Sequence, residues 1–295
     1  MSAPLKNAPP KNESGVNASP ARVPFGAALR RRLPKALSGR IGLALLVVVL
    51  AVALLGPLCT PYPPDRTVGI PFAGPSAGHP LGLDFLGRDV LSRVLSGGLS
   101  VVLYAGAATL AAYAVGLTVG LLAGYSRSWL EPVLMRLTDV LLSFPALVFL
   151  LLLATAFGRG ITGVVIATAL IQQPPIIRIV RSAALEQSLR GYVEAAVARG
   201  EGTVSVLRRE ILPNIARPVA ADAGLRFSWS VLLIAGVNFL GLGLQPPASD
   251  WGLMVSENRG GIALNPSSML VAAALLGALT LAINLLGDAL AGGTE

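Results

Sequence analysis

The sequence contains few of the residues that build most catalytic and metal sites. Among its 295 residues there is one cysteine, Cys59, and one histidine, His79. A single cysteine excludes an internal disulfide and a thiolate metal cluster, and a single histidine argues against a zinc site and a Ser-His pair. We therefore expect no metal site, and we interpret His79 as a loop residue.

Lysine is also scarce, because Lys6, Lys11 and Lys35 near the N-terminus are the only three. No Gly-x-x-x-x-Gly-Lys-Ser/Thr loop is present, so the chain cannot cradle ATP phosphates in that way. No paired-carboxylate cleft or nucleophile triad is visible. We expect a chain that is not an enzyme and binds no cofactor.

Charged residues make up only 13% of the chain and hydrophobic residues 54%, whereas soluble domains carry about 25% charged residues. The apolar residues occur in long blocks, which indicates surrounding lipid rather than one large core. The net charge of +8 could suit nucleic acid, but the basic residues flank apolar blocks and lack interleaved aromatics. We expect lipid contact and no nucleic-acid partner.

Six blocks approach or exceed the roughly 20 apolar residues that cross a bilayer as a helix. The predicted fold class is therefore all-α, a polytopic membrane protein with six transmembrane helices. Residues 1–40 are predicted to be a disordered basic tail, and residues 59–97 an extracytoplasmic loop. Residues 98–290 contain five of the six helices. The predicted spans are residues 41–58, 98–123, 133–157, 161–180, 219–244 and 269–290.

The distribution of arginine and lysine predicts the orientation. Basic residues concentrate in the tail and in residues 178–217, while the other side of the membrane carries only five arginines. Cytoplasmic segments are enriched in these residues. We expect a multi-pass membrane protein with both termini in the cytoplasm.

The loop between the fourth and fifth predicted spans has features of two short helices. Residues 188–199 are good helix formers, and Gly200 is typical of a left-handed helix cap. Thr203 is predicted to cap a second helix, which Pro213 ends. The small side chains of Ala195 and Ala196 would allow entry into a groove of another protein. A solvated helical hairpin fits the spacing equally well.

A resemblance favours docking. Glu194-Ala195-Ala196, followed by Gly200 and Leu212-Pro213, resembles the EAA loop of permeases in binding-protein-dependent ABC importers. One position departs, since Glu210 stands where the pattern has isoleucine and Ile211 follows it. The resemblance implies a type I ABC importer permease fold, with residues 181–217 as the coupling loop that docks into an ATPase subunit. The residues implied are Glu194, Ala195, Ala196, Arg199, Gly200, Leu212 and Pro213.

Other stretches resemble the C-type dipeptide/oligopeptide permeases of that family. They are residues 79–82, 84–93, 239–247 and 251–252. The resemblance implies a B-type permease partner, two ATP-binding subunits that carry ATP and Mg²⁺, and an extracytoplasmic solute-binding protein. It also implies the bacterial plasma (inner) membrane and a peptide solute that crosses by alternating access. Nickel, glutathione and haem-like solutes remain open. A secondary transporter driven by an ion gradient is a different class, and it would require titratable residues at mid-depth, which the spans lack.

Polar residues inside predicted spans are candidates for the solute path, because exposing them to lipid is costly. Gln172, Gln173 and Asn238 are such residues, although hydrogen bonding between helices explains them equally well. Pro174 and Pro175 are predicted to kink or unwind the fourth span. Small residues spaced by four, Ala112, Gly116, Gly120 and Gly124, predict a face for close helix packing.

The extracytoplasmic loops have local signals of their own. Residues 84–96 predict an interfacial helix, with ion pairs among Asp84, Arg88 and Asp89. Trp251 indicates either an ordered outer lid or an anchor at the membrane surface. Further local ion pairs are predicted for Arg136–Asp139 and Asp222–Arg226.

Overall fold

The computed structural model describes residues 37–126, 129–157 and 160–291. Within these ranges the regular structure is helical apart from two isolated bridges, Thr67 with Arg88 and Leu83 with Asp89. Among the described residues, five helices are long and apolar enough to cross a membrane, or six spans result if one bent helix pair is counted as a span. The predicted all-α, polytopic class is confirmed. The predicted tail lies outside the described residues except for residues 37–40, which form the first turn of a helix.

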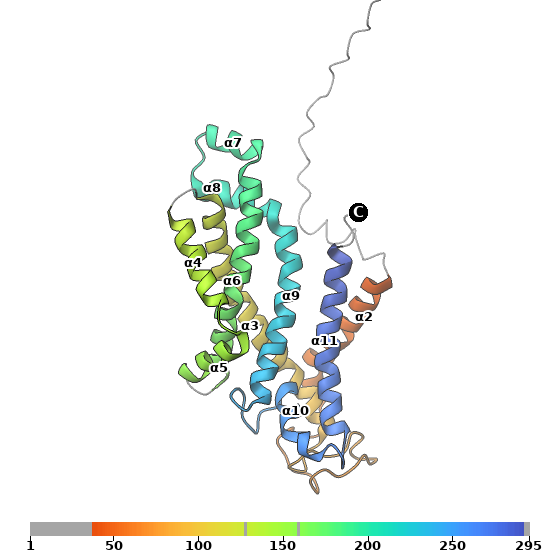
Figure 1. Ribbon diagram of the computed structural model, residues 1–295. Coiled ribbons are helices and arrows are strands. Elements are labelled where there is room, and N and C mark those ends of the chain that lie inside the picture. Colours follow the sequence, from red (N-terminus) through yellow and green to blue (C-terminus); the bar gives the residue numbers. More distant parts are fainter. Residues whose placement is uncertain (1–36, 127–128, 158–159, 292–295) are drawn as a thin grey trace, which may run out of the picture. The chain divides into compact units, whose positions relative to one another are not determined.

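Long helices separated by short ones make up the bundle (Figure 1). The long helices are α2 (Leu37–Leu55, continued by η1, Gly56–Leu58), α3 (Val90–Tyr125), α6 (Ile161–Ser188), α9 (Leu212–Phe239) and α11 (Ser267–Ala291). The short ones are α4 (Leu130–Leu142), α5 (Ala146–Ala156), α7 (Gly191–Ala198), α8 (Thr203–Val206), the π-helical η2 (Leu207–Ile211), α10 (Trp251–Asn258) and η3 (Arg259–Gly261). Figure 1 shows α7 at one end of the bundle and α10 at the other.

The third predicted span, residues 133–157, is not one straight helix. It consists of α4 and α5, which meet at 94°. Pro145 lacks a backbone N–H, and a proline disfavours helical backbone in the residue before it, here Phe144. The chain therefore turns sharply between Ser143 and Pro145 and forms an elbow beside α6.

The helix predicted at residues 84–96 begins six residues later, at Val90. Residues 84–89 form a turn, and α3 then runs unbroken from Val90 to Tyr125. The Asp89 carboxylate starts the helix by accepting a hydrogen bond from the Ser92 N–H at 2.8 Å. No residue ends the helix near 97, so the predicted interfacial segment is the first part of a long spanning helix.

The predicted small-residue face packs α3 against α6. A Cβ atom at Gly116 would lie 2.6 Å from the Ile176 side chain, and one at Gly120 would lie 2.7 Å from Val180. At Gly124 it would lie 2.6 Å from a backbone oxygen of α6. These contacts leave no room for side chains, so glycine allows the two helix backbones to approach closely.

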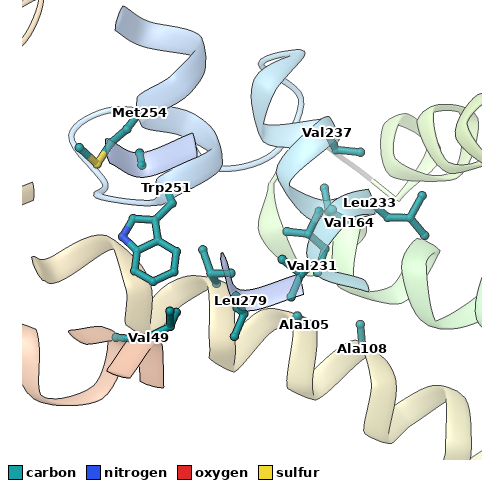
Figure 2. Close-up of a cluster of buried hydrophobic side chains, with 14 of the residues drawn as sticks. Val49, Ala105, Ala108, Val164, Val231, Leu233, Val237, Trp251, Met254 and Leu279 are labelled. Carbon is teal, nitrogen blue, oxygen red and sulfur yellow. The ribbon is translucent and has the colours of Figure 1, made fainter. Parts of the chain in front are cut away.

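One core cluster lies towards the α10 end (Figure 2). Trp251 is fully buried there, and its indole N–H donates to the Val94 carbonyl at 2.8 Å. A Cβ atom at Gly98 would lie 2.5 Å from this ring. The interpretation of Trp251 as a membrane-surface anchor is therefore wrong: the ring is a core side chain that holds α10 against α3.

Candidate functional site

Helix α7 has one buried face and one exposed face. Val193 and Ala196, three residues apart and so on one side of the helix, are buried in a second core cluster with residues of α3, α6 and η2. Glu194, Ala195 and Arg199 are exposed. The prediction that both alanines enter another protein is wrong for Ala196, because this side chain packs within its own subunit.

Gly200 ends α7 as predicted. Its φ is +84°, in the left-handed region that glycine tolerates best. The Glu201 N–H donates to the Ala196 carbonyl at 3.2 Å, and the Gly200 N–H donates to the Val197 carbonyl at 2.9 Å. These two bonds form a Schellman cap. Beyond it, hydrogen bonds from Arg199 and Ser205 lower the pKa of the Glu201 carboxyl.

The second predicted helix differs from the expectation at both ends. Its N-cap is Gly202, without a side-chain cap bond, so Thr203 is not the cap. Pro213 does not end it, because α8 continues through the π-helical η2 into α9, and Pro213 lies in the first turn of α9. Pro213 has no N–H to donate to the preceding turn, and just before it the ladder is π-helical, with the Leu212 N–H bonded to the Leu207 carbonyl. Leu212 is partly buried against the second core cluster.

The departure at Glu210 also has a structural explanation. Ile211, in the last position of η2, is fully buried in the second core cluster together with Leu207. Glu210 is only partly exposed and faces a different direction. Ile211 thus supplies the inward apolar side chain that the resemblance places one residue earlier.

Around the exposed residues of α7 lies an apolar surface, which we call the α7 face. Besides Glu194, Ala195 and Arg199, it comprises four exposed side chains. They are Leu189, Tyr192, Val197 and Val204, the last with 76% of its surface exposed. Apolar side chains grouped with charged ones are typical of protein interaction surfaces.

A cavity of about 170 Å³ lies at the α4–α5 elbow. Its walls are mostly apolar and include Phe144, Phe149 and Trp229, and its polar lining residues are Gln172 and Arg226. Gln172 is 4% exposed, and its Nε2 donates to the Arg226 carbonyl at 2.7 Å and to Ser230 Oγ at 3.0 Å. Gln172 therefore joins α6 to α9 at the border of the cavity.

The predicted Asp222–Arg226 pair forms beside this cavity. Arg226 Nη2 lies 3.1 Å from the Asp222 carboxylate, which also accepts a hydrogen bond from the Tyr113 hydroxyl at 2.5 Å. The predicted Arg136–Asp139 pair is wrong, because Asp139 pairs with Arg178 of α6 at 2.5 Å. These contacts tie α9 to α3 and α4 to α6.

The three predicted path residues do not share one environment. Gln172 borders the cavity, and Gln173 is partly exposed next to it in α6. Asn238 is fully buried and does not line the cavity: it donates to Asp250 and accepts from the Leu244 N–H, each at 2.9 Å. Of the predicted kink or unwinding of the fourth span, unwinding is wrong, since α6 stays helical through Pro174 and Pro175.

At the α10 end lies a buried ionic cluster. Asp84 pairs with Arg88 and Arg93, each at 2.7 Å, and Glu257 pairs with Arg93 at 2.6 Å and with Arg88 at 3.2 Å. The local Asp84–Arg88 pair was predicted. The roles of Arg93 and Glu257 were missed, because no local pattern links residues so far apart in the chain.

Comparisons with known proteins agree with this architecture. Residues 116–294 match the family described as binding-protein-dependent transport system inner membrane component. The chain is 34% identical to the glutathione transport system permease protein GsiD of Pectobacterium atrosepticum, over 91% of this chain and 90% of that protein. It is 34% identical to the di/tripeptide transport system permease protein DppC of Pseudomonas aeruginosa, over 84% of each chain.

A further relative and a solved structure extend the comparison. The dipeptide transport system permease protein DppC of Alkalihalophilus pseudofirmus is 30% identical over 98% of this chain and 94% of that protein. An inward-facing structure of the MetNI methionine ABC transporter shares the fold, with 21% identity and a TM-score of 0.56 over 70% of this chain and 97% of that one. The chain therefore belongs to the inner membrane components of binding-protein-dependent transport systems, as an ABC importer permease of the DppC/OppC-like type.

Proposed function

We propose that this chain forms half of the translocation path of a di- or oligopeptide importer and transmits the work of separate ATPase subunits through the α7 face. The observation that carries the proposal is the construction of α7. Buried Val193 and Ala196 fix the helix to its own subunit, and Gly200 caps it, while Glu194 and Ala195 stay free to contact a partner. The partners are a B-type permease, two ATP-binding subunits and an extracytoplasmic solute-binding protein, with α7 on the cytoplasmic side.

The connections of α7 supply a route for coupling. It follows α6 directly and precedes a helical run from Thr203 to Phe239 that crosses the membrane. Both α6 and α9 contribute walls to the elbow cavity. A displacement of α7 by closing ATPases would therefore move two walls of the cavity, which is the differential effect on two states that alternating access requires.

Glutathione is the second candidate solute. The support is the relative GsiD, whose printed name assigns glutathione transport and whose match covers nine-tenths of this chain. Competition separates the two candidates. In membrane vesicles with the cognate binding protein, labelled dipeptide uptake that excess glutathione does not reduce favours the peptide. Strong inhibition by glutathione, with direct uptake of labelled glutathione, favours the second candidate.

The coupling role is tested by cross-linking in a Cys59→Ser background, which removes the only native thiol. Ala195→Cys places a thiol on the α7 face, and Ala196→Cys places one on the buried side as a matched control. We expect Ala195→Cys to cross-link to a co-expressed ATPase subunit in a nucleotide-dependent way, and Ala196→Cys not to do so. An assembled complex in which neither position cross-links would contradict the proposal.

A charge reversal tests the same surface by activity. Glu194→Lys is expected to abolish most ATP-driven uptake while the protein still inserts in the membrane. Asp65→Lys reverses an exposed acid far from α7 along the chain and is expected to leave ATPase binding unchanged. Full uptake by a well-expressed Glu194→Lys variant would return α7 to a purely structural role.

A further inference from the structure

An arginine lies at the elbow cavity, within the spanning helix α9. The expectation that the spans lack titratable residues at mid-depth is wrong here, because Asp222 and Arg226 lie many residues from the end of the helix at Phe239. At about 1.5 Å per residue, Arg226 lies roughly 20 Å along α9 from Phe239, and Gln172 roughly 17 Å along α6 from Ile161. The hydrocarbon of a bilayer is about 30 Å thick. With the ends of α9 and α6 at one surface of that layer, the cavity lies inside the layer and out of reach of the headgroups at that surface. A charged side chain at such a depth is costly, so it is retained where it is paired or has a function.

Asp222 uses only part of the hydrogen-bonding capacity of Arg226. The Nε and Nη2 groups face the Asp222 carboxylate, and among the described residues Nη1 has no hydrogen-bond acceptor. A guanidinium carries five N–H donors in a planar fork that suits carboxylates. The Arg226 side chain is 18% exposed, whereas Asp222 is 9% exposed and is also held by Tyr113. The arginine is thus the more accessible member of the pair.

The rest of the cavity suits a peptide fragment. The aromatic rings of Phe144, Phe149 and Trp229 supply apolar walls next to Arg226. One water needs about 10–15 Å³ of such space, so about 170 Å³ holds a terminal carboxylate with its adjoining atoms. Apolar walls with a few polar groups at fixed positions are typical of small-molecule sites.

From this geometry we propose that Arg226 binds the free α-carboxylate of the solute as it crosses the membrane, with Phe144 and Trp229 beside the last side chain. The proposal rests on the proposed function and names the chemical group by which this subunit recognises its cargo. Peptides and glutathione both carry such a carboxylate, so the site suits either solute. Asp222 and Tyr113 hold the guanidinium in position when the site is empty.

The test compares a labelled dipeptide with the same dipeptide amidated at its C-terminus. Initial uptake rates of both are measured in proteoliposomes that contain the complete complex and the same binding protein. The preference of the binding protein cancels when the carboxylate-to-amide ratio of a variant is divided by that of the unmodified complex. Hydrogen bonds to charged groups contribute about 1.5–3 kcal/mol, so Arg226→Gln is expected to lower the ratio about tenfold or more.

Two further variants make the outcome decisive. Asp222→Asn combined with Arg226→Gln leaves no unpaired buried charge, so it guards against misfolding of the single variant and is expected to lower the ratio as much. Arg178→Gln breaks an ion pair of α6 whose arginine does not line the cavity, and is expected to leave the ratio unchanged.

The two proposals fail in different ways. If the unmodified complex takes up no peptide, the proposed function fails. If it does take up peptide, and the double variant assembles with an unchanged carboxylate-to-amide ratio, the Arg226 site fails while the proposed function stands. A ratio that falls equally in Arg178→Gln would show a general structural effect and would also overturn the site.

Discussion

Asn238 Nδ2 lies 2.9 Å from Asp250 Oδ1 and donates the hydrogen bond that joins the end of α9 to the start of α10. The amide oxygen of Asn238 accepts from the Leu244 N–H at the same distance. Replacing Asn238 by leucine removes both bonds and leaves the Leu244 N–H without its partner, at about 1–3 kcal/mol, while Asp250 keeps its other hydrogen bonds. We expect Asn238→Leu to lower the unfolding temperature in detergent by several degrees. Asn214→Leu, at an exposed position of α9, should change it little, and equal melting of the two variants would contradict the role of Asn238.

The same joint should respond to pH. Burial raises the pKa of Asp250, against the hydrogen bonds from Leu253, Asn238, Ser100 and Gly252 that lower it. The folded protein then holds this proton more tightly than the unfolded chain, whose carboxyl titrates near 3.9. The contribution of the group to stability is present below about pH 4 and is lost as the pH rises through the folded pKa.

Asparagine cannot titrate, so the unfolding temperature of Asp250→Asn minus that of the unmodified protein is expected to rise with pH from about 4 upwards. Thermal unfolding at a series of pH values between about 4 and 7 measures this difference. A difference that stays constant, or that falls as pH rises, would show that the hydrogen bonds outweigh the desolvation of the carboxylate.

The buried ionic cluster predicts a large effect of one arginine. Arg93 is fully buried and contacts Asp84, Glu257 and the Ala248 carbonyl. Arg93→Met leaves two buried carboxylates with Arg88 alone, and breaking a buried pair in this way costs about 3–5 kcal/mol. Arg66→Met, at an exposed arginine in the same segment, is the control. Lower expression and a clearly lower melting temperature are expected for Arg93→Met only.

The α3–α6 contact predicts opposite results for two glycines of the same helix. At Gly120 an added Cβ would meet Val180 at 2.7 Å, whereas at Gly106 the nearest atom lies 3.9 Å away. Overpacking costs about 1–3 kcal/mol, while alanine stabilises an open helical position by up to about 1 kcal/mol relative to glycine. Gly120→Ala should therefore lower the melting temperature and Gly106→Ala should keep or raise it. Equal melting temperatures of the two variants would show that α3 and α6 accommodate the added methyl group at Gly120 without loss of stability.

The Schellman cap of α7 predicts a functional defect without loss of the fold. Gly200 has φ +84° with open space around it, so alanine there meets backbone strain of about 1–2 kcal/mol but no clash. Gly202→Ala is the matched control, because its φ is −72° and its surroundings are equally open. We expect Gly200→Ala to reduce transport-coupled ATPase activity and Gly202→Ala to retain it. Equal activity in both would mean that the cap does not position the α7 face.

The spans were predictable because apolar blocks of about 20 residues report directly on the lipid environment. The elbow was missed because residues 133–157 are apolar enough overall to be taken as one span, despite Arg136 and Asp139, and hydropathy does not register the turn that Pro145 imposes. The burial of Trp251 was missed for a related reason. An aromatic residue shortly after Pro246 and Pro247 is also compatible with an anchor at the membrane surface. Only the structure shows that Gly98 of α3 leaves space for the ring.

In the candidate site too, features set by the local backbone were predictable, and features set by packing between helices were not. Gly200 was predictable because its need for a left-handed backbone is local. Ala195 and Ala196 are the same residue type at adjacent positions, so the sequence does not tell them apart. The structure does: Ala196 packs in the second core cluster, whereas Ala195 is exposed. Pro213 misled because a proline is compatible both with the end of a helix and with the first turn of the next one.

The length of α3 has a mechanical consequence. Its 36 residues, at about 1.5 Å each, make a rod of about 54 Å, well beyond the roughly 30 Å of the hydrocarbon. One end begins beside the ionic cluster that fixes it to α10, and the other ends next to the helices that hold α7. A tilt of about 10° moves one end of such a rod by about 9 Å relative to the other. A small rotation of α3 about the end that the ionic cluster fixes would therefore displace its other end, beside the α7 face, by several ångströms.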